Sequence, residues 1–327
     1  MEDAEVERLI GRRPRLSYAD IVRHPRLREA VRVYLDRFLA LYGGDPFLVR
    51  LLIEMGRYSV AHLVMLLEAG HEPAKRETWP TLGRVKETMA TYGLGSERHV
   101  DDLIRRLCEV GFLEMYPSEH DRRTKMLKCT ETLWAHDRDW LTAHIAPLAV
   151  CYPQHDYGPA LHGDRQFHMD FRRANVLFIP VGAKLIQFVP DMTLFLQHAG
   201  GYMVIAALLQ AALASGDGLE AAVPYADVGE RFGVSRTHVR RLLARAEENG
   251  LVRLQARGGH RVEILPRLWA SHDRGISCGM FFNDMIYAAT LESAAARSSA
   301  QAERSAQADS RAGDPPPAGR GRLRRVK

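Results

Sequence analysis

The 327-residue sequence has few cysteines, no long apolar run and no strong excess of one charge. Its apolar stretches are short and broken by charged residues or glycine, and the first residues lack an apolar signal core. We therefore expect no membrane span and a cytoplasmic protein. The four cysteines are scattered and form no CxxC pair, which indicates incidental or buried thiols in a reducing compartment: Cys108, Cys129, Cys151 and Cys278.

Motifs of catalysis are also missing. The sequence has no Walker loop, no Rossmann glycine pattern and no HExxH. One stretch holds four possible metal ligands whose spacing matches no tight zinc pattern: Cys151, His155, His162 and His168. We expect neither an enzyme nor a protein with a bound metal or cofactor.

The composition is that of an ordinary globular protein, with 46% hydrophobic and 26% charged residues. The length suggests about two domains. A net charge of +5 mildly favours polyanionic partners, but where the charges lie matters more than their total.

Apolar residues at helical spacing predict helices at 27–42, 46–54, 59–68, 192–215 (broken at Gly200-Gly201) and 277–292. The polar residues 1–22 predict a loosely held arm. The apolar run VLFIPVGAKLIQFV at 176–189 is typical of two short strands or of packed coil. The final residues are rich in Ala, Ser, Pro, Gly and Arg and predict disorder, with five positive charges among the last eight.

An internal repeat is the strongest pattern. The segment from Ser96 to Leu113 aligns with the segment from Ser235 to Val252, with seven of eighteen positions identical. Each copy has a serine suited to cap a helix, an apolar stripe at spacings of three, four and seven, and a glycine suited to end the helix. A shorter helix and a glycine-containing turn precede each copy.

This order of helix, short turn, capped second helix, glycine and strand is that of a helix-turn-helix followed by a wing. A helical hairpin without a role in DNA binding is the alternative, but two copies favour two winged helices. We therefore predict a mainly helical fold with small β wings, in which a helical connector joins two tandem winged helix-turn-helix domains. The expected segments are an N-terminal arm and amphipathic helix (1–44), the first winged helix (45–145), the connector (146–195), the second winged helix (196–270), a C-terminal helix (271–295) and a disordered basic tail (296–327).

The second copy presents a basic face suited to a major groove, because arginine binds guanine or phosphate and threonine contacts thymine or phosphate. Its candidate DNA-binding residues are Ser235, Arg236, Thr237, His238, Arg240 and Arg241. For His238, packing within the protein is the alternative. A glycine-rich basic hairpin tip follows, suited to a phosphate or a minor groove: Arg257, His260 and Arg261.

The first copy differs, because its outward face includes Glu97, Asp101 and Asp102. Two adjacent carboxylates repel phosphate. The alternatives are a helix that docks only through its first turn, a wing that supplies the affinity, or a unit that serves assembly. The candidate DNA-binding residues on this helix are Ser96, Arg98, His99 and Arg105.

The wing of the first copy runs from Tyr116 to Lys125 and carries Asp121-Arg122-Arg123. With the helix before it and Thr130-Glu131 after it, the segment 96–135 resembles the MarR family of bacterial transcription regulators. The resemblance implies that Asp121 orients Arg123 and that Arg123 enters a minor groove. Arg122 and Lys125 of the same run are further candidate DNA-binding residues. The family has one winged helix per chain and binds as a homodimer, so its dimer geometry does not transfer to two units in one chain.

The sequence thus predicts a sequence-specific regulator of transcription that binds double-stranded DNA with two helices and their wings. A monomer would span two half-sites about 10 base pairs apart, and a homodimer would present four reading helices. One alternative is a plasmid replication initiator with tandem winged helices. Another is a chromosome-organisation protein whose winged helices bind protein. No residue pattern identifies a small-molecule effector.

Overall fold

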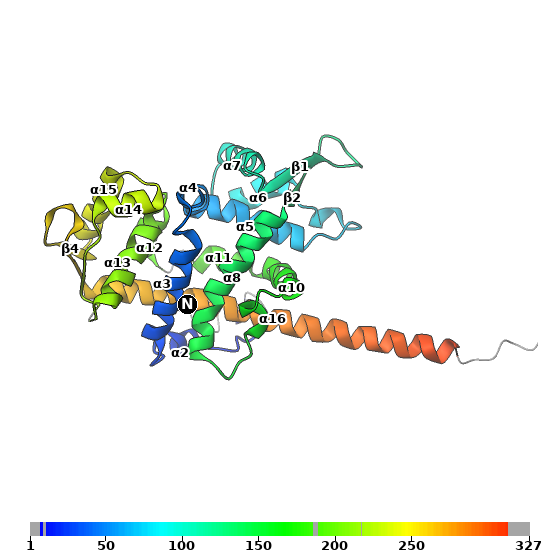
Figure 1. Cartoon of the computed structure of the whole chain (residues 1–327). Helices are drawn as coiled ribbons and strands as arrows, with labels where there is room; N and C mark the ends of the chain where they lie inside the picture. The colour runs from blue at the N-terminus through cyan, green and yellow to red at the C-terminus, as the bar shows by residue number, and fades with distance from the viewer. Residues whose placement is uncertain (1–6, 9–10, 186–188, 217, 313–327) are drawn as a thin grey trace, which may run out of the picture.

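The computed structural model describes residues 7–8, 11–185, 189–216 and 218–312. They form a mainly helical protein with two small antiparallel sheets (Figure 1). This confirms the predicted fold class at that level: helices predominate and the strands form short hairpins.

The N-terminal part consists of α2 (Tyr18–Val22), α3 (Leu27–Tyr42) and α4 (Pro46–Leu52). Residues 18–22 are not the loosely held arm that their polarity predicted, because Ser17 caps α2 and Ile21 is fully buried. The predicted start of α4 is confirmed. The Asp45 carboxylate accepts hydrogen bonds from the backbone N–H groups of Phe47 and Leu48, at 2.9 and 3.1 Å.

The next group of elements begins with α5 (Met55–Ala69), four residues earlier than its pattern suggested. After a 3₁₀ turn at Arg76–Thr78 come α6 (Leu82–Thr91), α7 (Glu97–Glu109), strands β1 (Leu113–Pro117) and β2 (Lys125–Cys129), and α8 (Glu131–Cys151). The two strands are antiparallel, with Leu113 opposite Cys129 and Pro117 opposite Lys125. Thr81, just before α6, forms an isolated bridge to Met126 on β2.

The connector is helical, as predicted, but neither strands nor coil is correct for the described part of its apolar run, residues 176–185. It contains α9 (Gly158–Leu161), α10 (Arg165–Asn175), a 3₁₀ turn at Val176–Phe178 and α11 (Ile179–Leu185). Residues 186–188 lie outside the described part. Burial gives the physical reason: Phe178 and Val181 are each 1% exposed and pack in the central core, where a helical turn satisfies its own backbone.

The predicted break in the long apolar helix is confirmed. It separates α12 (Pro190–Leu196) from α13 (Gly201–Ser215), and the two are bent by 114°. Gly200 has φ of +66°, and a Cβ at Gly201 would lie 2.3 Å from the carbonyl oxygen of Phe195. Both positions therefore require glycine.

The last group of elements begins with α13. It continues with β3 (Glu220–Ala221), α14 (Tyr225–Phe232), α15 (Arg236–Glu248), β4 (Val252–Leu254), a 3₁₀ turn at Arg257–Gly259 and β5 (Val262–Ile264). These strands form one antiparallel sheet in the order β3-β5-β4. The final helix is α16 (Pro266–Ala312).

The helix α16 corrects the predicted C-terminal boundary. Disorder was expected from residue 296, but the helix continues to Ala312 and extends beyond the body of the molecule at the right of Figure 1. Alanine, glutamine, glutamate and arginine are good helix formers, and the first proline after Pro266 comes only at position 315. The rest of the predicted basic tail, residues 313–327, lies outside the described part.

Two hydrophobic clusters hold these groups together. One lies among α5, α6, α7 and the β1–β2 sheet. The other cluster joins α3, α8, α13, α14, α15 and α16. The last group, from α13 to α16, therefore shares its core with the helices α3 and α8. A backbone hydrogen bond also joins the α4–α5 junction to the bend between α12 and α13: the N–H of Gly200 donates to the carbonyl of Ile53, at 2.8 Å.

A buried ionic cluster fastens α8 to α10. Arg172 donates from Nε and Nη2 to the two carboxylate oxygens of Asp137, at 2.7 and 2.8 Å, and His168 Nε2 donates to the same carboxylate at 2.7 Å. All three side chains are at most 3% exposed. Burial alone would raise the pKa of Asp137, but Arg172 and the His168 hydrogen bond lower it overall.

Candidate nucleic-acid interface

The capped helices of the sequence repeat are α7 and α15. Ser96 Oγ accepts from the backbone N–H of His99 at 3.3 Å, and Ser235 Oγ accepts from that of His238 at 3.1 Å. After each helix a glycine takes the left-handed conformation, with φ of +75° at Gly111 and +66° at Gly250. The predicted caps and ends are confirmed, and both serines are occupied in capping.

The predicted apolar stripes are also confirmed. Val100, Leu103, Ile104 and Leu107 are buried on α7, as are their counterparts Val239, Leu242, Leu243 and Ala246 on α15. The opposite faces of the two helices are therefore the ones available to a partner.

The available face of α15 is basic and unneutralised. Arg236, Thr237, Arg240 and Arg241 are all exposed. Within the described part of the chain, none of the three arginines forms an ion pair or a hydrogen bond through its guanidinium. Three guanidinium groups on one face of a Ser-capped helix give a surface that attracts phosphate and can donate to base edges.

The available face of α7 carries acidic residues at the positions where α15 carries arginines. Glu97, Asp101 and Asp102 align with Arg236, Arg240 and Arg241 of the second copy. Each of these carboxylates has a cationic neighbour. Lys86 on α6 lies 2.8 Å from Asp101 and 3.9 Å from Glu97, while Asp102 lies 3.0 Å from Arg105 and 4.0 Å from Arg98.

These pairs change the expectation for α7. Arg98 and Arg105 remain exposed, but both lie against the same aspartate. The face is thus locally neutralised rather than strongly acidic, and its two predicted DNA-binding arginines are already paired.

The two histidines of the repeat lie inward instead of on the available faces. A Cβ at Gly56, in the first turn of α5, would lie 3.3 Å from His99 Nε2, and a Cβ at Gly95 would lie 3.3 Å from His99 Cδ2. His238 lies beside His198, with ring centroids 6.2 Å apart, and burial lowers its pKa. The Nε2 atoms of both histidines are buried and have no partner among the described residues.

His99 therefore packs next to the start of α5, and His238 packs next to the start of α13. Their equivalent positions in the repeat, four residues into each motif, reflect packing. His99 and His238 therefore do not lie on the faces available to DNA.

The loop between β1 and β2 projects from the body at the upper right of Figure 1. Asp121 shapes its tip: one carboxylate oxygen accepts from the backbone N–H of Arg123 at 3.0 Å, and the other accepts from the Thr124 hydroxyl at 3.1 Å. Asp121 thus fixes the backbone of Arg123 rather than its guanidinium. Arg122, Arg123 and Lys125 are exposed and have no ion-pair partner in the described residues.

The shorter hairpin between β4 and β5 is folded back on its own group. The Val223 N–H donates to the Gly259 carbonyl at 2.8 Å, and a Cβ at Gly259 would lie 2.2 Å from the Val223 oxygen. Arg261 donates to both carboxylate oxygens of Glu220 on β3, at 2.8 and 3.0 Å. Of the predicted basic tip, Arg257 and His260 are exposed while Arg261 is held by Glu220.

The helix α4 lies between the two capped helices. The Arg106 guanidinium of α7 lies 5.9 Å from the ring centre of Phe47, and a Cβ at Gly233, in the turn before α15, would lie 2.8 Å from Pro46. In Figure 1, α7 and α15 lie along the upper edge of the molecule with α4 between them, while α2 lies at the bottom. The helix α15 and the β1–β2 loop thus both lie in the upper part of this view.

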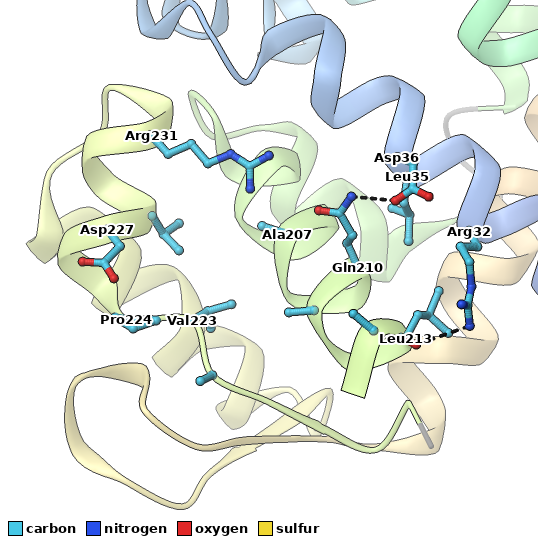
Figure 2. Close-up of a pocket in the computed structure, with 14 residues that line it drawn as sticks. Arg32, Leu35, Asp36, Ala207, Gln210, Leu213, Val223, Pro224, Asp227 and Arg231 are labelled. Carbon is cyan, nitrogen blue, oxygen red and sulfur yellow. Dashed lines mark hydrogen bonds between the residues drawn. The ribbon is translucent and has the colours of Figure 1, made fainter. Parts of the chain in front are cut away.

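A groove of about 420 Å³ lies on another surface, between α3, α13 and α14 (Figure 2). Several of its polar side chains have partners: Gln210 donates to Asp36 at 2.7 Å, and Arg32 donates to the carbonyl of Leu213 at 3.3 Å. These bonds join α3 to α13, which indicates that the groove is a junction between elements.

The possible metal ligands of the connector do not gather. In the described part of the chain, no group of three or more histidine, cysteine or acidic side chains is placed to hold a metal ion. Likewise, no single described helix is long and apolar enough to cross a membrane, although α12 and α13 together meet that test of length and composition.

No protein-family model matches this chain, and no curated protein matches it.

Proposed function

We propose that this protein is a sequence-specific regulator that binds double-stranded DNA and uses two winged helix-turn-helix units in one chain. The order of elements supports this in both halves. In the first half, the helix α5 is followed by the bridge residue Thr81, the helices α6 and α7, the strands β1 and β2, and the helix α8. The second half repeats this order from α13 to α16, with β3 in the place of the bridge residue.

The observation that carries the proposal is the face of α15. Arg236, Arg240 and Arg241 are exposed on the side opposite the buried stripe and are not neutralised within the described chain. A helix in a major groove needs such donors, because arginine hydrogen-bonds to guanine or to phosphate.

The first unit adds contacts mainly through its wing. The β1–β2 loop projects and carries three unpaired cations, whereas the two arginines of α7 lie against Asp102. Asp121 holds the turn, so the Arg123 guanidinium is free to enter a minor groove, as the MarR resemblance suggested. The two units thus contribute unequally, the second through its helix and the first through its wing.

Binding-site selection from genomic fragments, carried out with the full chain at two salt concentrations, tests the proposal. We expect enrichment of a defined sequence and an affinity that falls as salt rises. Retention of all fragments alike would mean that binding lacks sequence specificity, and no retention at low salt would refute the proposal.

A further inference from the structure

A cavity of about 420 Å³ lies between the two units. Its lining comes from α3, α5, α6, α8 and the connector on one side, and from α12, α13 and α16 on the other. The volume falls within the range of about 300–1,000 Å³ that is typical of small-molecule sites. Two glycines of α16 line it, Gly275 and Gly279, and a Cβ at Gly279 would have no heavy atom within 4 Å.

Stacked rings form one wall of this central cavity. The ring centres of Tyr58 and Trp140 are 5.4 Å apart at 27°, and those of Trp140 and His144 are 3.6 Å apart at 21°. Tyr58 also stacks on His62 at 5.2 Å and 19°. Such a wall favours a flat aromatic ligand, because offset stacking adds to the burial of apolar surface.

The polar groups of the lining are few and carry little net charge. Burial lowers the pKa values of His62, His144 and His272 to about 3 in each case, so these rings are neutral. The Arg172 cation is balanced by Asp137, and the Glu54 carboxylate of the lining is balanced by Arg57, at 3.2 Å. A charged ligand would therefore lose its hydration without meeting an opposite charge, which disfavours it.

Arg172 and His272 each offer a hydrogen-bonding atom to a ligand. Arg172 uses Nε and Nη2 for Asp137, which leaves Nη1 outside those bonds. His272 is 1% exposed and uses Nε2 with the Tyr202 hydroxyl at 3.2 Å, whereas its Nδ1 is buried without a partner among the described residues. Buried polar atoms are nearly always paired, so this one points to a missing partner.

We propose that the central cavity binds a neutral, planar aromatic molecule that carries a carbonyl or ring-nitrogen acceptor, and that this ligand changes how the protein binds DNA. The proposed effect of the ligand on DNA binding rests on the proposed DNA-binding function, whereas the proposed binding of the ligand does not.

The lining explains the link to DNA. Leu94 lies in the turn directly before α7, and Tyr92 ends α6, so both lie next to the first reading helix. Leu196 of α12 and Tyr202 of α13 come from the second unit. A ligand that contacts both sides would fix the relative positions of α7 and α15, and through them the spacing of half-sites that the protein accepts.

Nile red is a suitable probe, because it is neutral, flat and has carbonyl and ring-nitrogen acceptors, and its fluorescence rises in apolar surroundings. In the absence of DNA, we expect saturable binding with one probe per chain. Gly279→Phe should fill the open space and weaken binding at least tenfold. Gly44→Phe is the matched control, because Gly44 also has open space around its Cβ but does not line the cavity. Circular dichroism checks folding, and Gly279→Leu is the second variant if Gly279→Phe does not fold.

Failure of the wild-type protein to bind the probe, or equal binding by Gly279→Phe and the wild type, would overturn the cavity assignment. The link to DNA is tested by measuring affinity for the selected sequence with and without saturating Nile red. A change of fivefold or more in the wild type, absent in Gly279→Phe, supports it, and an unchanged affinity overturns it. If the protein binds the probe but no DNA, the proposed function fails while the ligand site stands.

Discussion

Removal of the basic face of α15 is the most direct perturbation that the structure offers. The variant Arg236→Ala/Arg240→Ala/Arg241→Ala deletes three exposed side chains that have no ion-pair partner in the described part of the chain. Surface substitutions of this kind change the free energy of unfolding by about 0.5 kcal/mol or less each, so the fold should persist.

The effect on DNA binding should be far larger. A good arginine contact to a base is worth about 1–3 kcal/mol. Three such contacts therefore predict a loss of at least about 3 kcal/mol, or roughly two orders of magnitude in Kd. Where an arginine contacts phosphate instead, the slope of log K against log salt should fall by about 0.9 for each contact removed.

Fluorescence anisotropy with the selected duplex, measured over a salt series, gives both quantities. The matched control is Arg13→Ala/Arg23→Ala/Arg37→Ala, which makes the same change in net charge by removing three exposed arginines outside α15 that also lack ion pairs in the described residues. We expect the control to lose much less affinity. Equal losses in the two variants would mean that total charge, and not the face of α15, determines binding.

Three further predictions follow from individual contacts. Arg123→Ala should weaken specific binding by about 1–3 kcal/mol if its guanidinium enters a groove; an unchanged Kd would show that the β1–β2 loop does not contact DNA. Asp137→Ala should lower the free energy of unfolding in urea by about 3–5 kcal/mol, because it leaves Arg172 buried without its carboxylate, and a loss below 1 kcal/mol would contradict this. Acidification from pH 7 to pH 5 should destabilise the fold by up to about 6 kcal/mol. Three buried histidines have a pKa near 3 in the folded state: His62, His144 and His272. Because the pKa of an unfolded histidine is about 6.5, each of them stabilises the folded state above that pH, and this contribution is lost as the pH falls. Equal urea midpoints at the two pH values would exclude buried neutral histidines.

Local patterns predicted the elements that build the proposed interface. Ser96 and Ser235 cap their helices, Gly111 and Gly250 end them with positive φ, and Gly200 marks the bend between α12 and α13. These features depend on a few neighbouring residues, and their chemistry is therefore visible in the sequence.

Features that depend on distant residues were not predictable in the same way. His99 and His238 follow their capping serines at the same spacing, which suggested a shared role at DNA. The packing of each ring next to the preceding helix, at Gly56 and beside His198, depends on the tertiary fold. The Asp137–Arg172 pair joins residues on two helices, and no local motif announces it.

The prediction of strands or packed coil for the apolar run of the connector failed for a related reason. An apolar run in this chain is compatible with a strand, a helix or packed coil when it is read alone. The central core decides the outcome, because Phe178 and Val181 are buried there within helical turns. The cavity between the units is less visible still, since it depends on where several elements leave space.

The role of α7 is the open question that follows from the unequal units, and Asp102 can decide it. This carboxylate lies 3.0 Å from Arg105 and 4.0 Å from Arg98, both on the same exposed face. Exposed pairs of this kind contribute about 0–1 kcal/mol to stability, so Asp102→Ala should fold normally. It would release two arginines on α7.

If α7 lies against DNA, the release of these arginines should tighten binding by about 1 kcal/mol, roughly fivefold. Asp139→Ala is the control, because it removes an exposed carboxylate on α8 that has no ion pair in the described chain and makes the same change in net charge. Tighter binding by Asp102→Ala alone would place the face of α7 at the duplex. Equal affinities for Asp102→Ala, Asp139→Ala and the wild type would refute that contact, and would leave the first unit to act through the β1–β2 loop.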